Sequence, residues 1–271
     1  MNRALFVLLL LVLIAVAASG GGVVEERTRL RLATTTSTES SGLLAELLPP
    51  FERANNVIVD VIAVGTGAAL ELGRNGDVDV LMVHAPELEE QFVREGYGVG
   101  RVGFMYNDFV ILGSESDPAG IAGTADVAAA FEAIAESESL FISRGDNSGT
   151  HNKELAIWDK AGISPEGSWY REAGQGMGAV ITIANNELAY TLTDRGTYLA
   201  YRGDIDMGVL VEGDPLLFNP YAAIAVSPDR HPEAQIDLAQ DLIAYFVSDE
   251  GQQIIGNYRV EGESLFTPDA D

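Results

Sequence analysis

Three short turns carry most of the chemistry that can be recognised in this sequence. They span residues 34–37, 65–67 and 143–151, and each joins a strand-like stretch to a helix-like one. A helix N-terminus presents free N–H groups and about half a positive charge, and neighbouring hydroxyls add further donors. Because ligands of open α/β sheets bind beyond the carboxyl ends of strands, three such turns in one chain favour an oxyanion site.

The third turn is the most informative. It places Arg144 near the hydroxyls of Ser148 and Thr150, and its glycines allow the backbone to approach a ligand closely. Each turn also has a purely structural interpretation: hydroxyls that cap a helix, a tight glycine turn, or a surface pair between Arg144 and Asp146. For a single motif, both interpretations stay open.

A secreted serine hydrolase is the alternative from a different function class. Ser148, His151 and Asp146 could act as nucleophile, base and orienting carboxylate. Three residues of one short turn cannot easily place the histidine between the other two, and the sequence around Ser148 is not the Gly-x-Ser-x-Gly elbow. Hydrolysis of a chromogenic ester would separate the two classes.

Other patterns are weaker. Residues 174–179 fit a dinucleotide-binding fingerprint only if alanine is accepted at the last position, and no clear strand precedes them, so we interpret them as a flexible turn. Asp194 could reach a pocket or pair with its neighbour on the surface. The spacing of His84, His151 and His231 is not that of metal ligands, which argues against a zinc site.

The hydrophobic pattern predicts the elements that must position these turns. Thr36 followed by Glu39 is a capping-box signature, which predicts a helix from Thr36 through Leu48. A second helix is expected from Ala68. Further strands are predicted at residues 30–33, 57–64, 78–83, 109–112 and 141–143, and further helices at residues 150–160, 179–186 and 238–247. This alternation predicts an α/β fold with largely parallel sheets and helices on their faces.

The composition excludes several function classes. Sixteen Lys and Arg residues against 41 Asp and Glu give a formal charge of −25, and nucleic-acid binding needs clustered basic residues. With 47% hydrophobic residues the chain can form a sizeable core. The lack of cysteine removes disulfides, thiolate metal sites, a cysteine nucleophile and a lipid-modified N-terminal cysteine. The acidity fits a halophilic source and an ordinary acidic secreted protein equally well.

The start of the chain indicates export. Arg3 precedes an uninterrupted apolar run at residues 4–18, and small residues follow, so residues 1–19 are predicted to be a secretory signal peptide. The run is shorter than the roughly 20 residues of a membrane-spanning helix, although an uncleaved anchor is the alternative. We therefore expect a periplasmic protein without a lipid anchor.

Eight stretches together resemble one family, the periplasmic tungstate-binding proteins of ABC importers. That family is a branch of the two-domain type II solute-binding proteins. Each stretch is weak alone, whereas the set, in this order, is specific and covers nearly all of the chain after the predicted signal. The stretches are residues 33–44 (ATTTSTESSGLL), 64–70 (VGTGAAL), 79–86 (DVLMVHAP), 105–113 (MYNDFVILG), 143–158 (SRGDNSGTHNKELAIW), 169–178 (WYREAGQGMG), 189–200 (AYTLTDRGTYLA) and 248–266 (SDEGQQIIGNYRVEGESLF).

The resemblance implies two α/β lobes that clamp an oxyanion in the cleft between them. The crossing segments would lie near residues 108–114 and 219–225, so that residues 28–109 and 222–271 form one lobe and residues 110–221 the other. The implied ligand is tungstate, with molybdate as an open alternative and sulfate or phosphate as the nearest alternatives within the fold class. The implied partner is the membrane permease of an ABC importer. We expect a monomer with no enzymatic activity, cofactor or metal site.

The resemblance also carries the family's anion contacts onto the first and third turns, and location and donor chemistry add three hydroxyls. The contacts implied by the family are Thr35, Thr36, Ser37 and Arg144, and the added hydroxyls are those of Thr66, Ser148 and Thr150. Two departures are visible: Asn147 stands where the family has an acidic residue, and Asn152 stands where it has a lysine. These departures remove one charge of each sign beside the site, which bears on its fine tuning.

Overall fold

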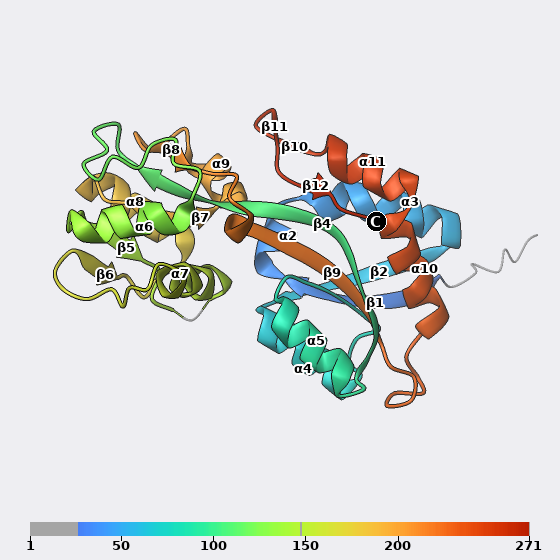
Figure 1. The fold of residues 1–271 in the computed structure, drawn as a ribbon. Helices are drawn as coiled ribbons and strands as arrows, with labels where there is room; N and C mark the ends of the chain where they lie inside the picture. Colours follow the sequence, from blue (N-terminus) through green and yellow to red (C-terminus); the bar gives the residue numbers. More distant parts are fainter. Residues whose placement is uncertain (1–26, 147, 271) are drawn as a thin grey trace, which may run out of the picture.

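The computed structural model describes residues 27–146 and 148–270, and it contains two groups of elements joined by two long strands (Figure 1). The joining strands are β4 (Gly98–Gly113) and β9 (Phe218–Val226). Within the described residues no helix is long and apolar enough to cross a membrane. The predicted signal peptide and Asn147 lie outside the described residues.

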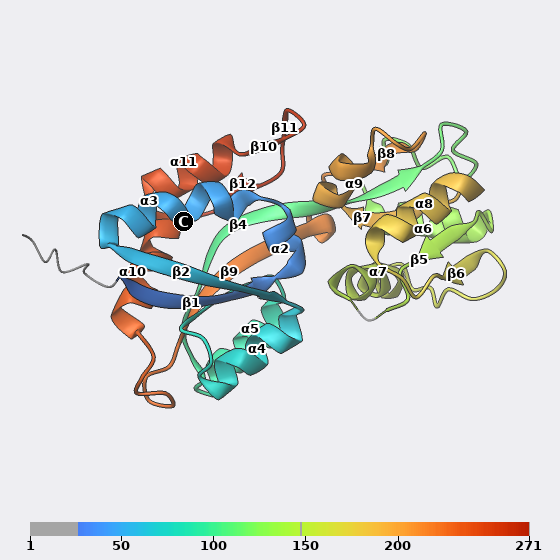
Figure 2. The same cartoon turned by 180° about the vertical axis from the view of Figure 1, so that it is seen from behind.

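The first lobe is built on a mixed sheet in the order β2-β1-β3-β9-β4-β12. Helices α3, α10 and α11 cover one face of this sheet, and α4 and α5 cover the other (Figures 1 and 2). Its remaining elements are β1 (Thr28–Thr35), α2 (Thr36–Ser40), α3 (Leu43–Asn55), β2 (Val57–Val64), α4 (Thr66–Asn75), β3 (Val80–Val83), α5 (Pro86–Arg94), α10 (Ile236–Val247), α11 (Asp249–Asn257), β10 (Arg259–Val260), β11 (Glu263–Ser264) and β12 (Thr267–Pro268).

The second lobe forms around the far end of β4, which pairs with β7 and β8. Strands β5 and β6 are parallel, and a parallel bridge between Phe141 and Tyr190 brings β5 beside the start of β7. The elements of this lobe are α6 (Val127–Glu136), β5 (Phe141–Ser143), α7 (Gly149–Lys160), β6 (Tyr170–Glu172), α8 (Met177–Glu187), β7 (Thr191–Asp194), α9 (Arg195–Tyr201), β8 (Gly208–Val211) and the 3₁₀ helix η1 (Pro215–Leu217).

The change of partners along β4 shows where the chain passes between the lobes. Residues from Gly98 to Asp108 pair with β9, whereas Phe109 begins the pairing with β7. Strand β9 pairs with the first-lobe part of β4 from Phe218 onward. These switches support a division of the chain near both crossings, and the lobe limits 28–109, 110–221 and 222–271 stay a prediction.

Three local predictions need correction. The prediction of largely parallel sheets is wrong for β4 and β9, because strands that cross between the lobes in opposite directions pair antiparallel with each other. The helix predicted from Thr36 through Leu48 is broken at Gly42, which has a φ of +82°, and its cap is Thr35 rather than Thr36. The helix predicted from Ala68 begins at Thr66.

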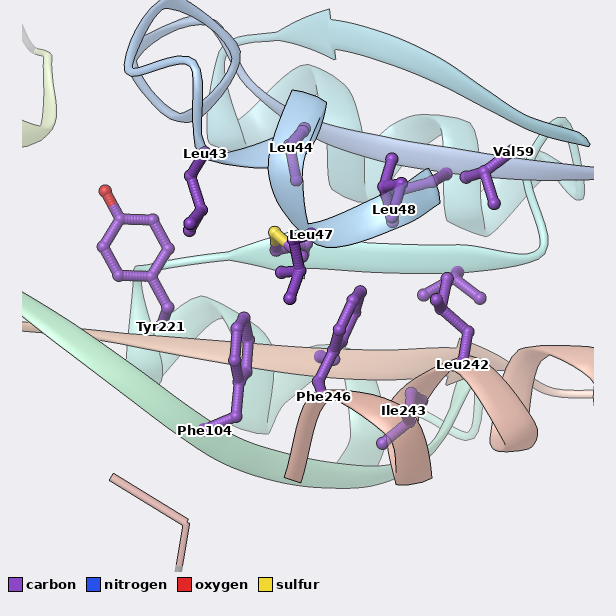
Figure 3. Close-up of a cluster of buried hydrophobic side chains, with 14 of the residues drawn as sticks. Leu43, Leu44, Leu47, Leu48, Val59, Phe104, Tyr221, Leu242, Ile243 and Phe246 are labelled. Carbon is purple, nitrogen blue, oxygen red and sulfur yellow. The ribbon is translucent and has the colours of Figure 1, made fainter. Parts of the chain in front are cut away.

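Each lobe has its own apolar core. In the first lobe, leucines of α3 gather with Phe104 of β4 and Phe246 of α10 in one cluster on the same face of the sheet (Figure 3). The ring of Tyr221 lies at one end of this cluster with its hydroxyl oxygen turned away from it (Figure 3). In the second lobe, Trp158 of α7 is 1% exposed and packs against Phe131 at a ring-centroid distance of 4.3 Å. The separate cores hold the facing edges of the two lobes in place.

Asp79 forms a buried ion pair that predicts acid sensitivity of the first lobe. Its carboxylate accepts hydrogen bonds from the Arg31 backbone N–H at 2.9 Å and guanidinium at 2.8 Å, and from the Gln235 N–H at 3.2 Å. Burial raises the pKa of Asp79, but these bonds outweigh burial and leave the pKa below its ordinary value. The stabilisation is therefore present above about pH 4 and is lost as pH falls through the folded-state pKa.

We expect Asp79→Asn to lower the free energy of unfolding at neutral pH by about 1.5–3 kcal/mol, the range for hydrogen bonds to charged groups. Urea unfolding of the wild type and the variant at neutral and acidic pH measures the difference. The gap should shrink in acid, where the wild-type carboxylate is also neutral. A gap that stays constant with pH would mean that the charge of Asp79 contributes nothing.

Candidate anion-binding site

The first lobe presents one polar edge where three parallel strands end. Strand β1 is in register with both neighbours: Thr35 pairs with Val64 of β2, and Thr34 pairs with Met82 of β3. The carboxyl ends of the three strands therefore lie side by side, and α2, α4 and α5 begin at or just beyond them. Thr66 opens α4 at this edge, and His84 follows β3. This is the kind of edge where open α/β sheets bind ligands.

The turn that begins at Thr35 combines free donors with a closed internal network. Thr35 is 4% exposed and caps α2 by accepting the Thr38 N–H at 3.4 Å. Its hydroxyl also lies 2.6 Å from the Thr38 hydroxyl and 3.1 Å from the Ser37 hydroxyl. Thr36 and Ser37 are exposed at the start of α2, so their N–H groups and hydroxyls can donate to an anion.

The second lobe presents the matching edge. Strands β5 and β6 end at Ser143 and Glu172, which pair with each other, and α7 and α8 begin beyond them. Helix α9 begins directly at the end of β7. The caps of these helices differ: Ser148 and Asp194 cap α7 and α9 with their side chains, whereas Gly176 precedes α8 with no side-chain cap. Several helix N-termini thus lie at one edge of this lobe.

The third predicted turn is held by Asp146. Its carboxylate accepts from Arg144 Nε at 2.8 Å and from the Ser148 N–H at 3.0 Å, as expected if Asp146 orients the arginine and the loop backbone. Burial alone would raise the pKa of Asp146, but the hydrogen bonds from Ser148 and Arg144 outweigh burial and leave the pKa below its ordinary value. The carboxylate therefore stays ionised. The Arg144 side chain is 23% exposed, and Thr150 is 7% exposed one residue into α7.

Gly149 and Lys153 bring the third turn against the first lobe. A Cβ built on Gly149, the first residue of α7, would lie 3.8 Å from His84 Cε1. Lys153 donates to the carbonyls of Leu216 and Phe218 at 3.1 and 3.0 Å, which anchors α7 on the crossing. Because His84 also contacts Thr35, the start of α7 faces the start of α2. Thr66 lies at the same first-lobe edge. It follows β2, which is separated from the crossing strand β9 by β3 and β1.

Sequence reasoning missed the polar cluster that supports the first turn. His84 Nε2 lies 3.2 Å from Thr35 Oγ1, and His84 Nδ1 lies 3.0 Å from Asn219 Oδ1. Asn219 in turn donates to Asn107 Oδ1 at 2.8 Å, and the His84 ring lies against Tyr221 at a centroid distance of 4.7 Å. The sequence does contain a signal for this cluster. His84 directly follows the buried strand β3, and the neighbouring strand β1 ends in the hydroxyl-rich turn.

The sequence interpretation of residues 174–179 as a flexible turn needs correction. A short strand, β6, does precede it, contrary to the sequence interpretation, and Gly176 leaves the first N–H groups of the helix without a side-chain cap. Helix α8 therefore opens at the carboxyl edge of β6, as α7 does beyond β5. The strand escaped prediction because three residues, only partly buried or exposed, give little periodic signal.

The hydrolase interpretation is not supported by the geometry around Ser148. The Ser148 hydroxyl oxygen accepts the backbone N–H of His151 at 3.3 Å, which is the contact of a helix cap. Asp146 is bonded to Arg144 and to the Ser148 backbone. Within residues 27–146 and 148–270, moreover, no group of histidine and carboxylate side chains could hold a metal ion.

Two aspartates at the second-lobe edge, Asp146 and Asp194, are bonded within their own turns. Asp194 accepts from the Thr197 N–H at 2.8 Å and from the Thr197 hydroxyl at 2.6 Å, rather than pairing with Arg195. Arg195 instead pairs with Asp108 and Glu212. The facing edges offer N–H groups, hydroxyls and the Arg144 guanidinium as donors, and one further carboxylate, that of Glu172 at the end of β6, is 59% exposed and lies 3.9 Å from His151 Nε2. The donors suit a fully ionised oxyanion.

Two lobes joined by crossing strands, with helix N-termini facing across the junction, define a type II solute-binding protein fold. A family model described as the PBP superfamily domain matches residues 22–250. The tungstate-binding protein TupA of Peptoclostridium acidaminophilum is 44% identical over 238 residues, which are 86% of this chain and 83% of that protein. The chain belongs to the family of these tungstate-binding proteins, within the PBP superfamily.

Two solved structures are similar over most of the chain. The tungstate-binding protein TupA of Desulfovibrio alaskensis G20 has a TM-score of 0.86 and 45% identity, covering 90% of this chain and all of that one. A structure described as the tungstate ABC transporter from Geobacter sulfurreducens has a TM-score of 0.76 and 57% identity, covering 85% of this chain and 98% of that one. These likenesses agree with the two-lobed fold.

Proposed function

We propose that this protein captures tungstate between its two lobes and delivers it to an ABC importer. The observation that carries the proposal is the approach of α7 to the first lobe, where Gly149 lies against His84 and the Arg144 turn faces the Thr35 turn. The proposed ligand contacts are Thr35, Thr36, Ser37, Thr66, Arg144, Ser148 and Thr150. The similarity to tungstate-binding relatives supports the choice of anion.

The donor chemistry favours tungstate or molybdate over phosphate. Phosphate near neutral pH keeps at least one proton and needs an acceptor, whereas tungstate carries none. Asp146 and Asp194 could accept such a proton, but both carboxylates are bonded within their own turns. An unpaired carboxylate against a fully ionised anion would be repulsive. Sulfate is also unprotonated near neutral pH, so the donor chemistry does not separate it from tungstate.

The proposed role includes a place in the cell and a partner in the membrane. We propose that residues 1–19 direct export, that the mature protein works outside the cytoplasm, and that it docks as a monomer on the permease of its importer. It needs no cofactor and performs no reaction of its own. The solute-binding, transport-related names of the relatives support this role.

Titration calorimetry of the ligand-free protein tests the function directly. The protein is refolded without ligand and titrated with tungstate, molybdate, sulfate and phosphate in turn. We expect tight binding of tungstate or molybdate, weaker binding of sulfate, and no competition by excess phosphate. Equal affinity for phosphate would overturn the donor-only site and would make Asp146 or Asp194 a direct ligand. Binding of none of the four anions would overturn the proposed function.

The global charge predicts an unusual salt dependence of association. The whole chain carries a formal charge of −25 and therefore repels a dianion at long range, while the local N–H and hydroxyl dipoles attract it. Salt screens the long-range repulsion within about 10 Å at 0.1 M. We expect the association rate, measured by stopped-flow fluorescence, to rise as an inert salt is added from low concentration. A falling rate would reveal a basic funnel.

A further inference from the structure

We propose that His84 positions the hydroxyl proton of Thr35 and thereby couples oxyanion binding to the uptake of one proton by its imidazole ring. The inference rests on the proposed function, because it concerns a residue behind the same site. Two nitrogens of one ring join Thr35 to the crossing strands: Nε2 lies 3.2 Å from Thr35 Oγ1, and Nδ1 lies 3.0 Å from Asn219 Oδ1.

The asparagine pair fixes the tautomer of the ring. Asn219 Nδ2 donates to Asn107 Oδ1 at 2.8 Å, so the carbonyl oxygen of Asn219 is the atom that faces His84. A carbonyl oxygen accepts only, so His84 Nδ1 carries the hydrogen. In the neutral ring Nε2 then has a lone pair and accepts the hydroxyl proton of Thr35.

Neutral His84 therefore withholds one donor from the anion. With its proton on His84, Thr35 Oγ1 uses its lone pairs for the Thr38 hydroxyl at 2.6 Å and the Thr38 N–H at 3.4 Å. The hydroxyl of Thr35 then has no proton left for the cleft. The donors available at this turn are the N–H groups and hydroxyls of Thr36 and Ser37.

Protonation of His84 reverses this arrangement. Both ring nitrogens become donors, so Nε2 donates to Thr35 Oγ1, and the Thr35 proton must turn away from the ring. It can pass to Ser37 Oγ at 3.1 Å or Thr38 Oγ1 at 2.6 Å, and one hydroxyl proton of this turn is then released for the anion. The change adds one donor and one positive charge beside the anion. Anion binding and protonation therefore favour each other, as linkage between two ligands requires.

The surroundings set the pH at which the change occurs. Burial lowers the pKa of His84 from its ordinary value near 6.5, against the opposing effects of Asn219 and of the Asp194 carboxylate. Asp194 faces the ring from the end of β7, and Tyr221 faces it from β9. Burial raises the pKa of Tyr221, so Tyr221 stays neutral in this range. The ring is thus neutral at pH 7 and gains its proton below the ordinary histidine range.

The tautomer can be read directly in the wild-type protein. In protein labelled with ¹⁵N-histidine, nitrogen chemical shifts at neutral pH distinguish the ring protonated on Nδ1 from the ring protonated on Nε2. His231→Gln and His151→Gln remove the other two histidine signals in turn and assign that of His84 even if a His84 variant does not fold. We expect the Nδ1–H form. The Nε2–H form would overturn the proposal.

The coupling is tested by titrating tungstate into the wild type, His84→Gln and the control His231→Gln. His231 bonds the Arg74 carbonyl at 2.9 Å, away from the cleft, and its loss removes the same titrating group. From about pH 8 to about pH 5.5 we expect affinity to rise by a few-fold in the wild type and in His231→Gln, because the buried ring gains only part of its proton in this range. In His84→Gln affinity should stay flat.

Calorimetry in two buffers of different ionisation enthalpy measures the protons taken up on binding. Uptake should appear near the His84 pKa and should be missing in His84→Gln. Wild-type binding of tungstate that is independent of pH, with no proton uptake, would overturn the role of His84 and leave the proposed function intact. Failure of the wild type to bind tungstate at every pH would instead overturn the proposed function.

Discussion

Replacing Arg144 with alanine is expected to weaken tungstate binding by about tenfold to more than a hundredfold, with little loss of stability. A hydrogen bond to a charged group is worth roughly 1.5–3 kcal/mol, which sets this range. The Arg144 side chain is only 23% exposed, and Asp146 holds its Nε, so the guanidinium is oriented before the anion arrives. Calorimetry gives the dissociation constant, and thermal unfolding without ligand gives the stability.

The matched control is Arg171→Ala in the same lobe. It removes the same charge from a side chain that is 46% exposed and pairs with Glu187. If only the overall charge of the protein affects binding, Arg144→Ala and Arg171→Ala will have the same dissociation constant for tungstate. Arg144→Lys keeps the charge but loses the planar fork of donors, so it should recover only part of the affinity. An unchanged dissociation constant in Arg144→Ala would leave Arg144 with a surface pairing to Asp146 and nothing more.

Trp158→Ala should produce the largest loss of stability, about 3–5 kcal/mol, the range for deleting a large buried aromatic side chain. Trp158 is 1% exposed and packs against Phe131 and Phe141, with ring-centroid distances of 4.3 and 5.5 Å. Its indole N–H also donates to the buried carboxylate of Glu154 at 3.2 Å. The substitution leaves both a cavity and a less satisfied buried acid, and the loss is large against a typical total of about 5–15 kcal/mol.

Leu155→Ala on the same helix is the control for helix propensity and for changes in the unfolded chain. Leu155 is 40% exposed, so its removal should change the free energy of unfolding by less than about 0.5 kcal/mol. Urea unfolding monitored by circular dichroism compares the two variants. Similar losses in both would show that Trp158 is not a core residue of the second lobe. Tungstate should restore part of the stability of Trp158→Ala, since binding favours the folded state.

Much of the fold could be predicted from periodicity because most strands and helices carry continuous or regularly spaced apolar residues. Residues 57–64 and 141–143 form strands as expected, and the helices predicted at 150–160 and 238–247 are present with small shifts at their ends. The antiparallel pairing of β4 with β9 escaped prediction because it joins segments more than a hundred residues apart. No local pattern encodes the direction in which the chain returns.

The hydrogen-bond donors of the site were easier to predict than the residues that hold those donors in place. Hydroxyls and an arginine at strand-to-helix turns carry their chemistry in the sequence itself, and Thr35 and Ser148 do cap helices at the facing edges. His84 depends on partners from another part of the chain, because its ring becomes informative only when Asn219 and Thr35 lie on either side of it. The ligand assignments of the seven predicted contacts remain to be tested.

A tungsten anomalous-difference map from crystals grown with tungstate is the most direct test that the anion binds between the two lobes. The strong anomalous scattering of tungsten locates the anion without any assumption about its contacts. We predict one dominant peak between the start of α2 and the start of α7, with tungstate oxygens at hydrogen-bond distances of roughly 2.7–3.2 Å from donors of Ser37 and Arg144. A dominant peak elsewhere on either lobe, or no peak in crystals of the folded protein, would contradict the proposed site.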